Sequence, residues 1–220
     1  MDNIREVKKL ILIGASGFGR EVAWLVERIN AIELEWDIVG FLDDNPNLAH
    51  DTVNGYEVLG KIEDSIKYED AYFACCVGSA KLRKEIIDKL KRLNSDIRFA
   101  TLIDPSVIMS NLVQIGEGSI ICAGTILTVN AYIGNHVIIN LDCTIGHDAE
   151  LKEFVTLYPS VNISGNVVID GYTEIGTGSQ IIQGKKVGLN TIIGAGSVVV
   201  SDINSNVTAV GVPCTPIEKS

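Results

Sequence analysis

Three histidines and the carboxylates beside them are the first candidates for chemistry in this chain. His147 stands in the segment Ile145-Gly-His-Asp148, directly before an aspartate. A neutral imidazole accepts a proton near neutral pH, and a carboxylate bonded to its second ring nitrogen fixes the tautomer and stabilises the imidazolium. The pair is therefore a candidate general base, with an ordinary surface histidine as the alternative. His50, in a polar loop, is predicted to be inert.

The segment Gly14-Ala-Ser-Gly17-Phe-Gly19 is a second candidate, because it joins a strand-like run to a helix-like run. Glycines permit a tight turn and a close approach of the backbone, and the N-terminus of a helix favours a phosphate. The spacing is GxxGxG and not the GxGxxG of dinucleotide sites. A simple strand-to-helix turn is the alternative interpretation.

Acidic and small residues end two further strand-like runs of the same half. Asp43 and Asp44 end one run, and Gly78 and Ser79 end the next. The carboxyl ends of parallel strands meet at one edge of a sheet, where acidic side chains can accept hydrogen bonds from a ribose or a base. Together with the glycine segment, these residues predict a nucleotide site at that edge. A solvated turn is the alternative for the two aspartates.

The elements that must position these groups alternate in the first half of the chain. Strands are expected at 9–13, 36–42, 71–77 and 97–102, with helices at 17–30 and 80–93. This alternation predicts a small parallel sheet with helices packed on it. Such a Rossmann-like domain, of about 100 residues, is half of a dinucleotide fold. It suits one nucleotide and disfavours an oxidoreductase that needs a dinucleotide.

The second half of the chain repeats every six residues. Ile, Leu or Val occupies fifteen successive positions of one register, from Ile115 to Val199, and Ile103 and Met109 extend it backwards. A helix would need an apolar residue every three or four positions, whereas an even period keeps these residues on one face of short strands. Repeats this short are typical of a parallel β-helix, in which three hexads close one coil.

Composition excludes several classes of function. The chain has 220 residues and a formal net charge of −10, so DNA or RNA would be repelled overall. No apolar run approaches the roughly 18 residues that span a bilayer, and no signal peptide is recognisable at the start. The five cysteines include no CxxC pair. We interpret them as buried thiols of a cytoplasmic protein.

Both halves resemble parts of one known enzyme family. The hexad run resembles the left-handed β-helix of the hexapeptide acyltransferases, and GASGFGREVAWLV, VGFLDDNP, GYEVLG and CVGSAKLRKEI resemble the nucleotide-sugar domain of its PglD/NeuD-like branch. That branch contains UDP-4-amino-sugar N-acetyltransferases and sialic-acid O-acetyltransferases of bacterial surface-glycan synthesis. The resemblance implies a Rossmann-like nucleotide-sugar domain over 1–102 and a β-helix acetyltransferase domain with a C-terminal tail over 103–220.

The resemblance also implies a reaction and its residues. Acetyl would pass from acetyl-CoA to the amino group of a UDP-linked 4-amino-6-deoxy sugar. His147 would be the general base, supported by Asp148, with Asn140 positioning the amino sugar and the Gly165 N–H facing the oxyanion. We expect Asn140, His147 and Gly165 to surround one point. The UDP part would contact Gly14, Ala15, Ser16, Asp43, Asp44, Gly78 and Ser79.

The acetyl-CoA residues follow from the same resemblance. Thr156 replaces a second histidine found in some relatives, and Thr177, Gly194 and Ala195 match positions along the CoA tail. Lys185 and Lys186 could meet CoA phosphates, with a solvated face as the alternative. Relatives assemble as homotrimers with a shared acetyl-CoA cleft, so we expect a homotrimer. No metal and no nucleic acid are expected as partners.

Three other functions are weighed against this one. An O-acetyltransferase acting on a hydroxyl of sialic acid or a related sugar is the main alternative. A zinc enzyme would need three imidazoles on one metal, but His136 and His147 are eleven residues apart and no third histidine is near them. A purely structural β-helix, such as an ice-binding one, would need ordered ranks of threonine, which the sequence lacks.

Overall fold

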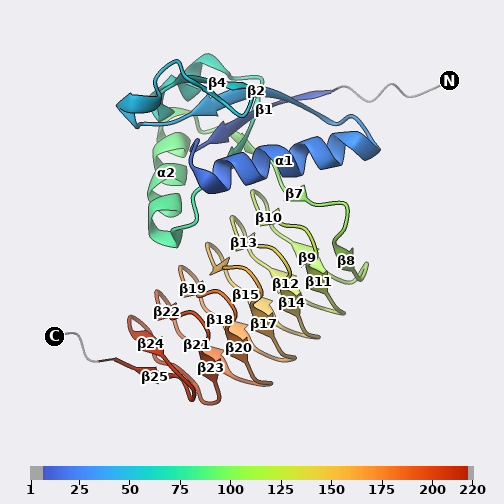
Figure 1. Cartoon of the computed structure of the whole chain (residues 1–220), viewed down its shortest axis with the longest axis vertical. Helices are drawn as coiled ribbons and strands as arrows, with labels where there is room; N and C mark the ends of the chain where they lie inside the picture. The colour runs from blue at the N-terminus through green and yellow to red at the C-terminus, as the bar shows by residue number, and fades with distance from the viewer. Residues whose placement is uncertain (1–6, 218–220) are drawn as a thin grey trace. The chain divides into compact units, whose positions relative to one another are not determined.

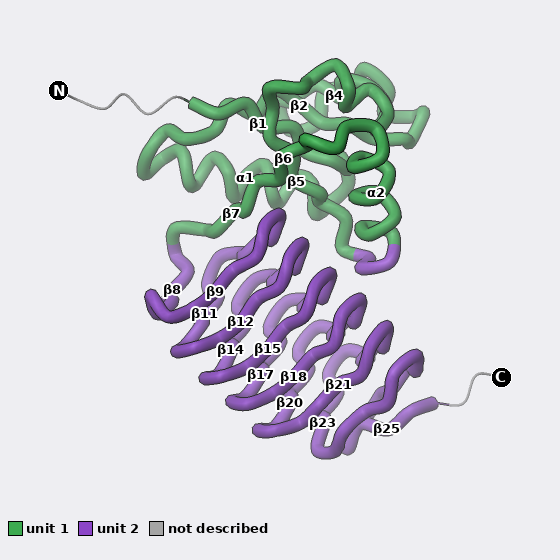
Figure 2. The backbone as a smooth tube through the Cα atoms, turned by 180° about the vertical axis from the view of Figure 1, so that it is seen from behind, with its two compact units in different colours: residues 1–78, 82–105 green, residues 79–81, 106–220 purple. Residues whose placement is uncertain are grey.

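The computed structural model describes residues 7–217 and divides into two compact units. Figure 2 colours the first unit (1–78 and 82–105) green and the second (79–81 and 106–220) purple. Within residues 7–217, no helix has the length and hydropathy that crossing a membrane would require. The two units are built on different principles, and each is described by itself below.

The first unit contains a mainly parallel sheet with strand order β3-β4-β2-β1-β5-β6, of which Figure 1 labels β4, β2 and β1. The elements up to residue 105 are β1 (Lys8–Ile13), α1 (Gly17–Ile32), β2 (Trp36–Leu42), η1 (Pro46–Leu48), β3 (Thr52–Val53), β4 (Tyr56–Gly60), η2 (Ile62–Lys67), β5 (Tyr72–Cys75), α2 (Ala80–Leu93), β6 (Arg98–Phe99) and β7 (Leu102–Ile103). Strand β1 lies between β2 and β5, and its last four residues are fully buried. The predicted α/β class is therefore confirmed.

Two features of this unit differ from the prediction. Strands β3 and β4 form an antiparallel hairpin that the sequence analysis did not predict, although Asn54-Gly55 is a strong hairpin signal and both residues have positive φ. The helical spacing of apolar residues in 80–93 predicts a stripe of Leu82, Ile86, Leu90 and Leu93, but Leu82 and Leu93 are 47% and 40% exposed. The buried face of α2 is centred on Leu90 and Ile87 instead.

The three glycines after β1 have separate physical roles. Gly14 has a φ of +97°, which favours glycine in the turn out of the strand. A Cβ on Gly19 would lie 1.9 Å from the carbonyl oxygen of Gly14, so only glycine lets α1 pack this close to the strand. A Cβ on Gly17 would meet only the end of Arg20, at 3.9 Å. The start of α1 is therefore open to a ligand.

The second unit is a parallel β-helix whose short strands stack on three faces (Figure 1). The first face holds β10 (Ile120–Ile121), β13 (Ile138–Ile139), β16 (Thr156–Leu157), β19 (Glu174–Ile175), β22 (Ile192–Ile193) and β24 (Thr208–Val210), with β25 (Thr215–Pro216) antiparallel to β24. The second face holds β8 (Ile108–Met109), β11 (Ile126–Leu127), β14 (Thr144–Ile145), β17 (Asn162–Ile163), β20 (Gln180–Ile181) and β23 (Val198–Val199). The third face holds β9 (Gln114–Ile115), β12 (Tyr132–Ile133), β15 (Glu150–Leu151), β18 (Val168–Ile169) and β21 (Lys186–Val187).

Each coil pairs in register with the coil eighteen residues away, as Ile121 does with Ile139. The second residue of each strand points inward, so Ile139, Leu157 and Ile175 stack in a buried column. Met109 belongs to the same register, because it pairs with Leu127, but it is 46% exposed. Its strand pairs with β11 on one side only, so the column is open at this end.

Buried hydroxyls explain the small residues of the hexad pattern. Ser119 donates from Oγ to the Gly134 carbonyl at 2.9 Å and accepts from the Val137 N–H at 3.0 Å. Thr173 makes the same pair of bonds to Gly188 and Thr191. Each hydroxyl therefore satisfies backbone groups of the following coil that would otherwise be buried without a partner, a condition that costs free energy.

Candidate active site

The corner that follows the second face carries the predicted base. We call it the second corner; it holds Asn130, His147, Asp148 and Gly165 on three successive coils. His147 Nδ1 lies 2.8 Å from Asp148 Oδ2. The two side chains are 50% and 48% exposed, so the imidazole is open to a ligand. The side chains of this predicted pair therefore meet in the folded chain.

Hydrogen bonding determines which form of the pair is present. Bonds from His147 first, and from Asn130, hold the pKa of the Asp148 carboxyl below its usual range. The carboxylate is therefore ionised at neutral pH and can only accept. His147 must then donate from Nδ1, which leaves the lone pair of a neutral ring on Nε2. Nε2 is the atom that could accept a proton from a substrate.

Asn130 is a member of this arrangement that the sequence analysis missed. Its Nδ2 donates to Asp148 Oδ1 at 3.0 Å, while the other carboxylate oxygen faces the imidazole. Asn130 and Asp148 both have left-handed backbones, with φ of 58° and 56°. The eighteen-residue interval between them is one coil. A search one coil before each candidate residue would therefore have found it.

Gly165 lies directly against the imidazole. A Cβ at this position would lie 2.4 Å from His147 Nε2 and 2.5 Å from Cε1, so any side chain would displace the ring. Glycine is needed here because the ring of one coil rests on the backbone of the next. The oxyanion contact of the Gly165 N–H stays a prediction.

Asn140 does not lie beside His147 in one chain, so the expectation that Asn140, His147 and Gly165 surround one point stays a prediction that needs a second subunit. Asn140 follows β13 of the first face, whereas His147 follows β14 of the second face. An interval of eighteen residues returns the chain to the same corner, but an interval of seven crosses a whole face. Asn140 Oδ1 accepts a bond from the Leu141 N–H at 2.7 Å, which orients its amide.

The predicted acetyl-CoA residues gather with Asn140 at the first corner, the one that follows the first face. Thr177 and Ala195 are exposed there, and Gly194 stands between β22 and Ala195. Thr156 lies within β16 and is 1% exposed, which leaves its side chain little surface for a CoA contact. The CoA roles of these residues stay predictions.

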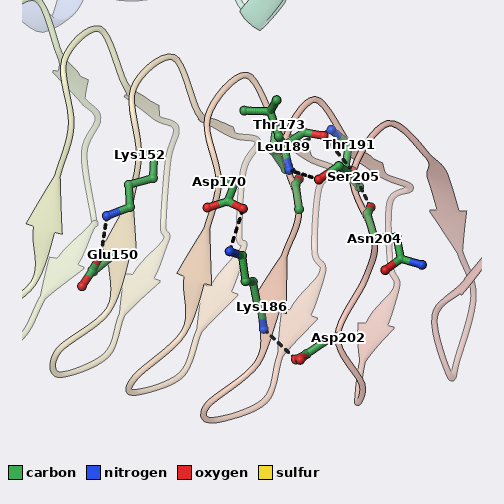
Figure 3. Close-up of polar contacts among 11 residues, drawn as sticks. Glu150, Lys152, Asp170, Thr173, Lys186, Leu189, Thr191, Asp202, Asn204 and Ser205 are labelled. Atoms are coloured by element: carbon green, nitrogen blue, oxygen red, sulfur yellow. Dashed lines mark hydrogen bonds and ion pairs between the residues drawn. The ribbon is translucent and has the colours of Figure 1, made fainter.

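Lys186 belongs to a charged surface on the third face. Its Nζ lies 3.1 Å from Asp170 Oδ2, and its backbone N–H donates to Asp202 Oδ1 at 2.9 Å (Figure 3). Lys152 pairs with Glu150 on the same face (Figure 3). The Lys186 side chain is 57% exposed, and its ammonium is already paired. These contacts favour the solvated-face interpretation over CoA phosphate binding.

His136 and Cys143, two other side chains that could be reactive, are packed inside this unit. His136 stands at the third corner and stacks on Phe154, which stacks on Tyr172. His136 and His147 are therefore at different corners, and residues 7–217 contain no group of three or more possible metal ligands. Burial raises the pKa of the Cys143 thiol to about 11. This thiol is neutral at pH 7 and is not an activated nucleophile.

The first unit has a cavity of about 320 Å³ at the carboxyl edge of its sheet. Five of the seven predicted nucleotide-binding residues line it: Gly14, Ser16, Asp43, Asp44 and Gly78. Apolar walls come from residues that were not predicted to bind the nucleotide, among them Ile62, Leu82 and Ile86. Ala15 is 2% exposed, and its N–H donates to Asp43. Ser79 belongs to the second unit.

The two aspartates also hold the loops around this cavity. Asp43 accepts from the N–H groups of Ala15 and Asn45, both at 2.8 Å. Asp44 accepts from the Ile62 N–H at 2.9 Å and pairs with Lys89 at 3.3 Å. Asp43 therefore ties the end of β2 to the glycine turn, and Asp44 ties it to η2. Any hydrogen bond to a nucleotide would be made by carboxylates that are already oriented.

Known proteins of this architecture identify the chain. Residues 9–90 match the family described as the PglD N-terminal domain. The acetyltransferase domain of PglB from Neisseria gonorrhoeae FA1090, solved with acetyl coenzyme A, is 31% identical with a TM-score of 0.87, covering 96% of this chain and 100% of that one. The chain belongs to the PglD-like family of hexapeptide-repeat sugar acetyltransferases.

Two further relatives of this PglD-like chain are described together with GDP-perosamine. GDP-perosamine N-acetyltransferase from Escherichia coli O157:H7 is 29% identical, covering 84% of this chain and 82% of that protein. PerB from Caulobacter crescentus, solved with CoA and GDP-perosamine, is 26% identical with a TM-score of 0.84, covering 97% of this chain and 99% of that one. These matches confirm the left-handed β-helix and an acetyl-CoA-dependent sugar N-acetyltransferase.

Replacing the imidazole should abolish most of the activity. His147→Ala is expected to lower turnover by roughly 10² to 10⁴, the usual contribution of a general base. Thermal stability should change little, because the side chain is half exposed. Steady-state kinetics with a melting curve test this, with His50→Asn as control. Unchanged turnover in a folded variant would remove His147 from the mechanism.

Removing the amide that holds the carboxylate should have a smaller effect. Asn130→Gly keeps the left-handed backbone but deletes the bond to Asp148, so turnover is expected to fall roughly three- to tenfold. Asn166→Gly is the matched control, since Asn166 has the same backbone conformation at the same corner. Equal turnover for the two variants would contradict a role for Asn130.

Proposed function

We propose that this enzyme transfers acetyl from acetyl-CoA to the exocyclic amine of a nucleotide-linked 4-amino-6-deoxy sugar in surface-glycan synthesis. The observation that carries the proposal is the His147–Asp148 pair, whose geometry leaves Nε2 of the neutral ring as the proton acceptor of a half-exposed side chain. The name of the curated relative, an N-acetyltransferase of GDP-perosamine, supports an amine acceptor on a nucleotide-linked sugar.

The reaction needs a base and no acyl-enzyme. The thioester of acetyl-CoA is already activated, so the sugar amine can attack its carbonyl carbon directly. The new C–N bond forms, Nε2 of His147 takes the proton that the amine must lose, and the C–S bond then breaks to release CoA. The Asp148 carboxylate stabilises the imidazolium formed in this step. The Gly165 N–H is proposed as a donor to the oxyanion.

Asn140 and the CoA residues can join this site only from a second copy of the chain. Within one chain they lie at the first corner, and His147 lies at the second corner. We infer a homotrimer in which the second corner of one subunit meets the first corner of the next. Exposed apolar residues near the second face, Ile108, Ile126 and Val129, suit such an interface.

The cavity of the first unit is the proposed site for the nucleotide. Its open glycine turn suits phosphates, and its apolar walls suit a base. The resemblance predicted UDP, whereas GDP-perosamine appears in the descriptions of the E. coli relative and of PerB. A domain devoted to a nucleotide favours a linked sugar over free sialic acid, which has no nucleotide to place there.

A substrate panel tests the proposed reaction. UDP-, GDP- and dTDP-linked 4-amino-6-deoxy sugars and free sialic acid are assayed at equal concentration by thiol release from acetyl-CoA. A nucleotide-linked amino sugar is expected to react at least about a hundredfold faster than free sialic acid, because only it fills both sites. Preference for sialic acid, or for a hydroxyl acceptor, would support the O-acetyltransferase alternative instead.

Mixed assemblies test the shared site. His147→Ala and Asn140→Ala are each expected to have low activity as pure proteins. When the two are co-expressed, about a quarter of the sites in random trimers should combine an intact His147 with an intact Asn140 from the neighbour. Activity should therefore rise well above that of either variant alone. Light scattering should give three times the 23.7 kDa chain mass, and a stable monomer would contradict the shared site.

A further inference from the structure

Arg83 is a buried cation directly behind the wall of the nucleotide cavity. It stands in the first turns of α2 and is 1% exposed, the largest side chain among those fully buried. One of its terminal guanidinium nitrogens donates to the carbonyl of Val77 at 2.7 Å and to the carbonyl of Gly78 at 2.9 Å. Both of these residues line the cavity.

The negative charge of the cavity wall makes the position of the Arg83 cation important for an anionic ligand. The wall includes two aspartates, and no lysine or arginine is among its described lining residues. The chain as a whole carries a formal net charge of −10. Lys89 pairs with Asp44 at 3.3 Å and offsets one of the two charges, so a nucleoside diphosphate would still meet the carboxylate of Asp43 at the cavity. A guanidinium buried one peptide layer behind the wall opposes this charge, and a buried charge acts over a longer range than an exposed one.

The two carbonyl bonds also set the direction of the peptide groups. In a trans peptide the C=O and N–H bonds point to opposite sides. When the carbonyls of Val77 and Gly78 point toward Arg83, the N–H groups of the same two peptide units point away from it. Arg83 thus orients backbone donors at the carboxyl end of β5, where a phosphate would approach.

The positive charge of Arg83 also acts on the neighbouring thiol of Cys75 in the protein interior. Burial raises the pKa of Cys75, the last residue of β5, to about 12, and the positive charge of Arg83 acts in the opposite direction. The field of Arg83 therefore reaches the strand end that borders the cavity.

We propose that Arg83 is a positioning residue for the diphosphate of the nucleotide-linked substrate: it orients the Val77–Gly78 backbone and supplies the positive charge that the cavity wall lacks. This inference rests on the proposed nucleotide site. Arg83 makes no predicted contact with the ligand and acts through the two peptide groups and through its field. Its removal should therefore weaken diphosphate binding without affecting the acetyl-CoA site.

Calorimetric titration of the full chain tests the proposal. UDP, UMP, GDP, GMP and acetyl-CoA are titrated into the wild type, Arg83→Gln, Arg83→Lys and Arg92→Gln. Arg92 is the matched control, because it is an exposed arginine of the same helix. Arg83→Gln should raise the Kd of the preferred diphosphate roughly tenfold or more, as expected for loss of a charged hydrogen-bonding group. The Kd of acetyl-CoA should be unchanged.

The ratio between the Kd values of the monophosphate and the diphosphate separates an effect of charge from a general distortion of the cavity. In Arg83→Gln the preference for UDP over UMP, or for GDP over GMP, should shrink. Arg83→Lys keeps the positive charge but loses the planar guanidinium with its several donors. It should therefore weaken diphosphate binding by roughly two- to fivefold and keep most of the preference for diphosphate over monophosphate. If Arg83→Gln does not fold, the lysine variant decides alone.

Three results would overturn the inference. They are a wild-type diphosphate Kd in the folded Arg83 variants, an equal loss for monophosphate and diphosphate in Arg83→Gln, and a loss for acetyl-CoA equal to that for the diphosphate in either variant. A wild-type chain that binds none of the four nucleotides would instead contradict the proposed nucleotide site itself. Failure of the inference and failure of the proposed function are therefore distinguishable.

Discussion

In-register pairing between residues eighteen positions apart is the constraint on which the β-helix site depends. The inward column favours this register, because a slip by one residue would turn the apolar positions outward. The buried hydroxyls of Ser119 and Thr173 reinforce it, since each satisfies backbone groups of the next coil. The same register places Asn130, Asp148 and Gly165 around His147. A half-exposed pair, His147 and Asp148, is therefore held by backbone that is hydrogen-bonded to the coils on either side.

The α/β unit positions its groups by a different means. Its cavity is surrounded by loops, and loops need their backbone groups tied down. Asp43 and Asp44 accept hydrogen bonds from backbone N–H groups of the neighbouring segments. Arg83 donates to two backbone carbonyls at the end of β5. The charged side chains near this cavity thus act first on the protein backbone, and a nucleotide would meet a surface already shaped by them.

The separation of the two corners is the reason why the proposed reaction needs the proposed homotrimer. One corner carries the predicted base and the other carries Asn140 with the predicted CoA residues, and a full strand face lies between them. A narrow triangular coil cannot enclose a cleft by itself, because its interior is filled by the apolar column. Substrates must bind outside the coil. An external surface becomes a cleft only where a second surface faces it.

Sequence alone determined the architecture and the pairing of His147 with Asp148, because both depend on residues that are close together along the chain. The hexad register predicts the β-helix, and neighbours in sequence such as His147 and Asp148 stay neighbours in the fold. The hairpin β3–β4 could also have been predicted from the sequence, because Asn54-Gly55 is typical of a two-residue hairpin turn. Only the tertiary structure decided which distant residues meet: Asn130 joins the pair, Asn140 does not, and Arg83 turns back to hold Val77 and Gly78. The physical reason is that such contacts depend on coil geometry and side-chain direction, which spacing along the chain does not specify without the three-dimensional path.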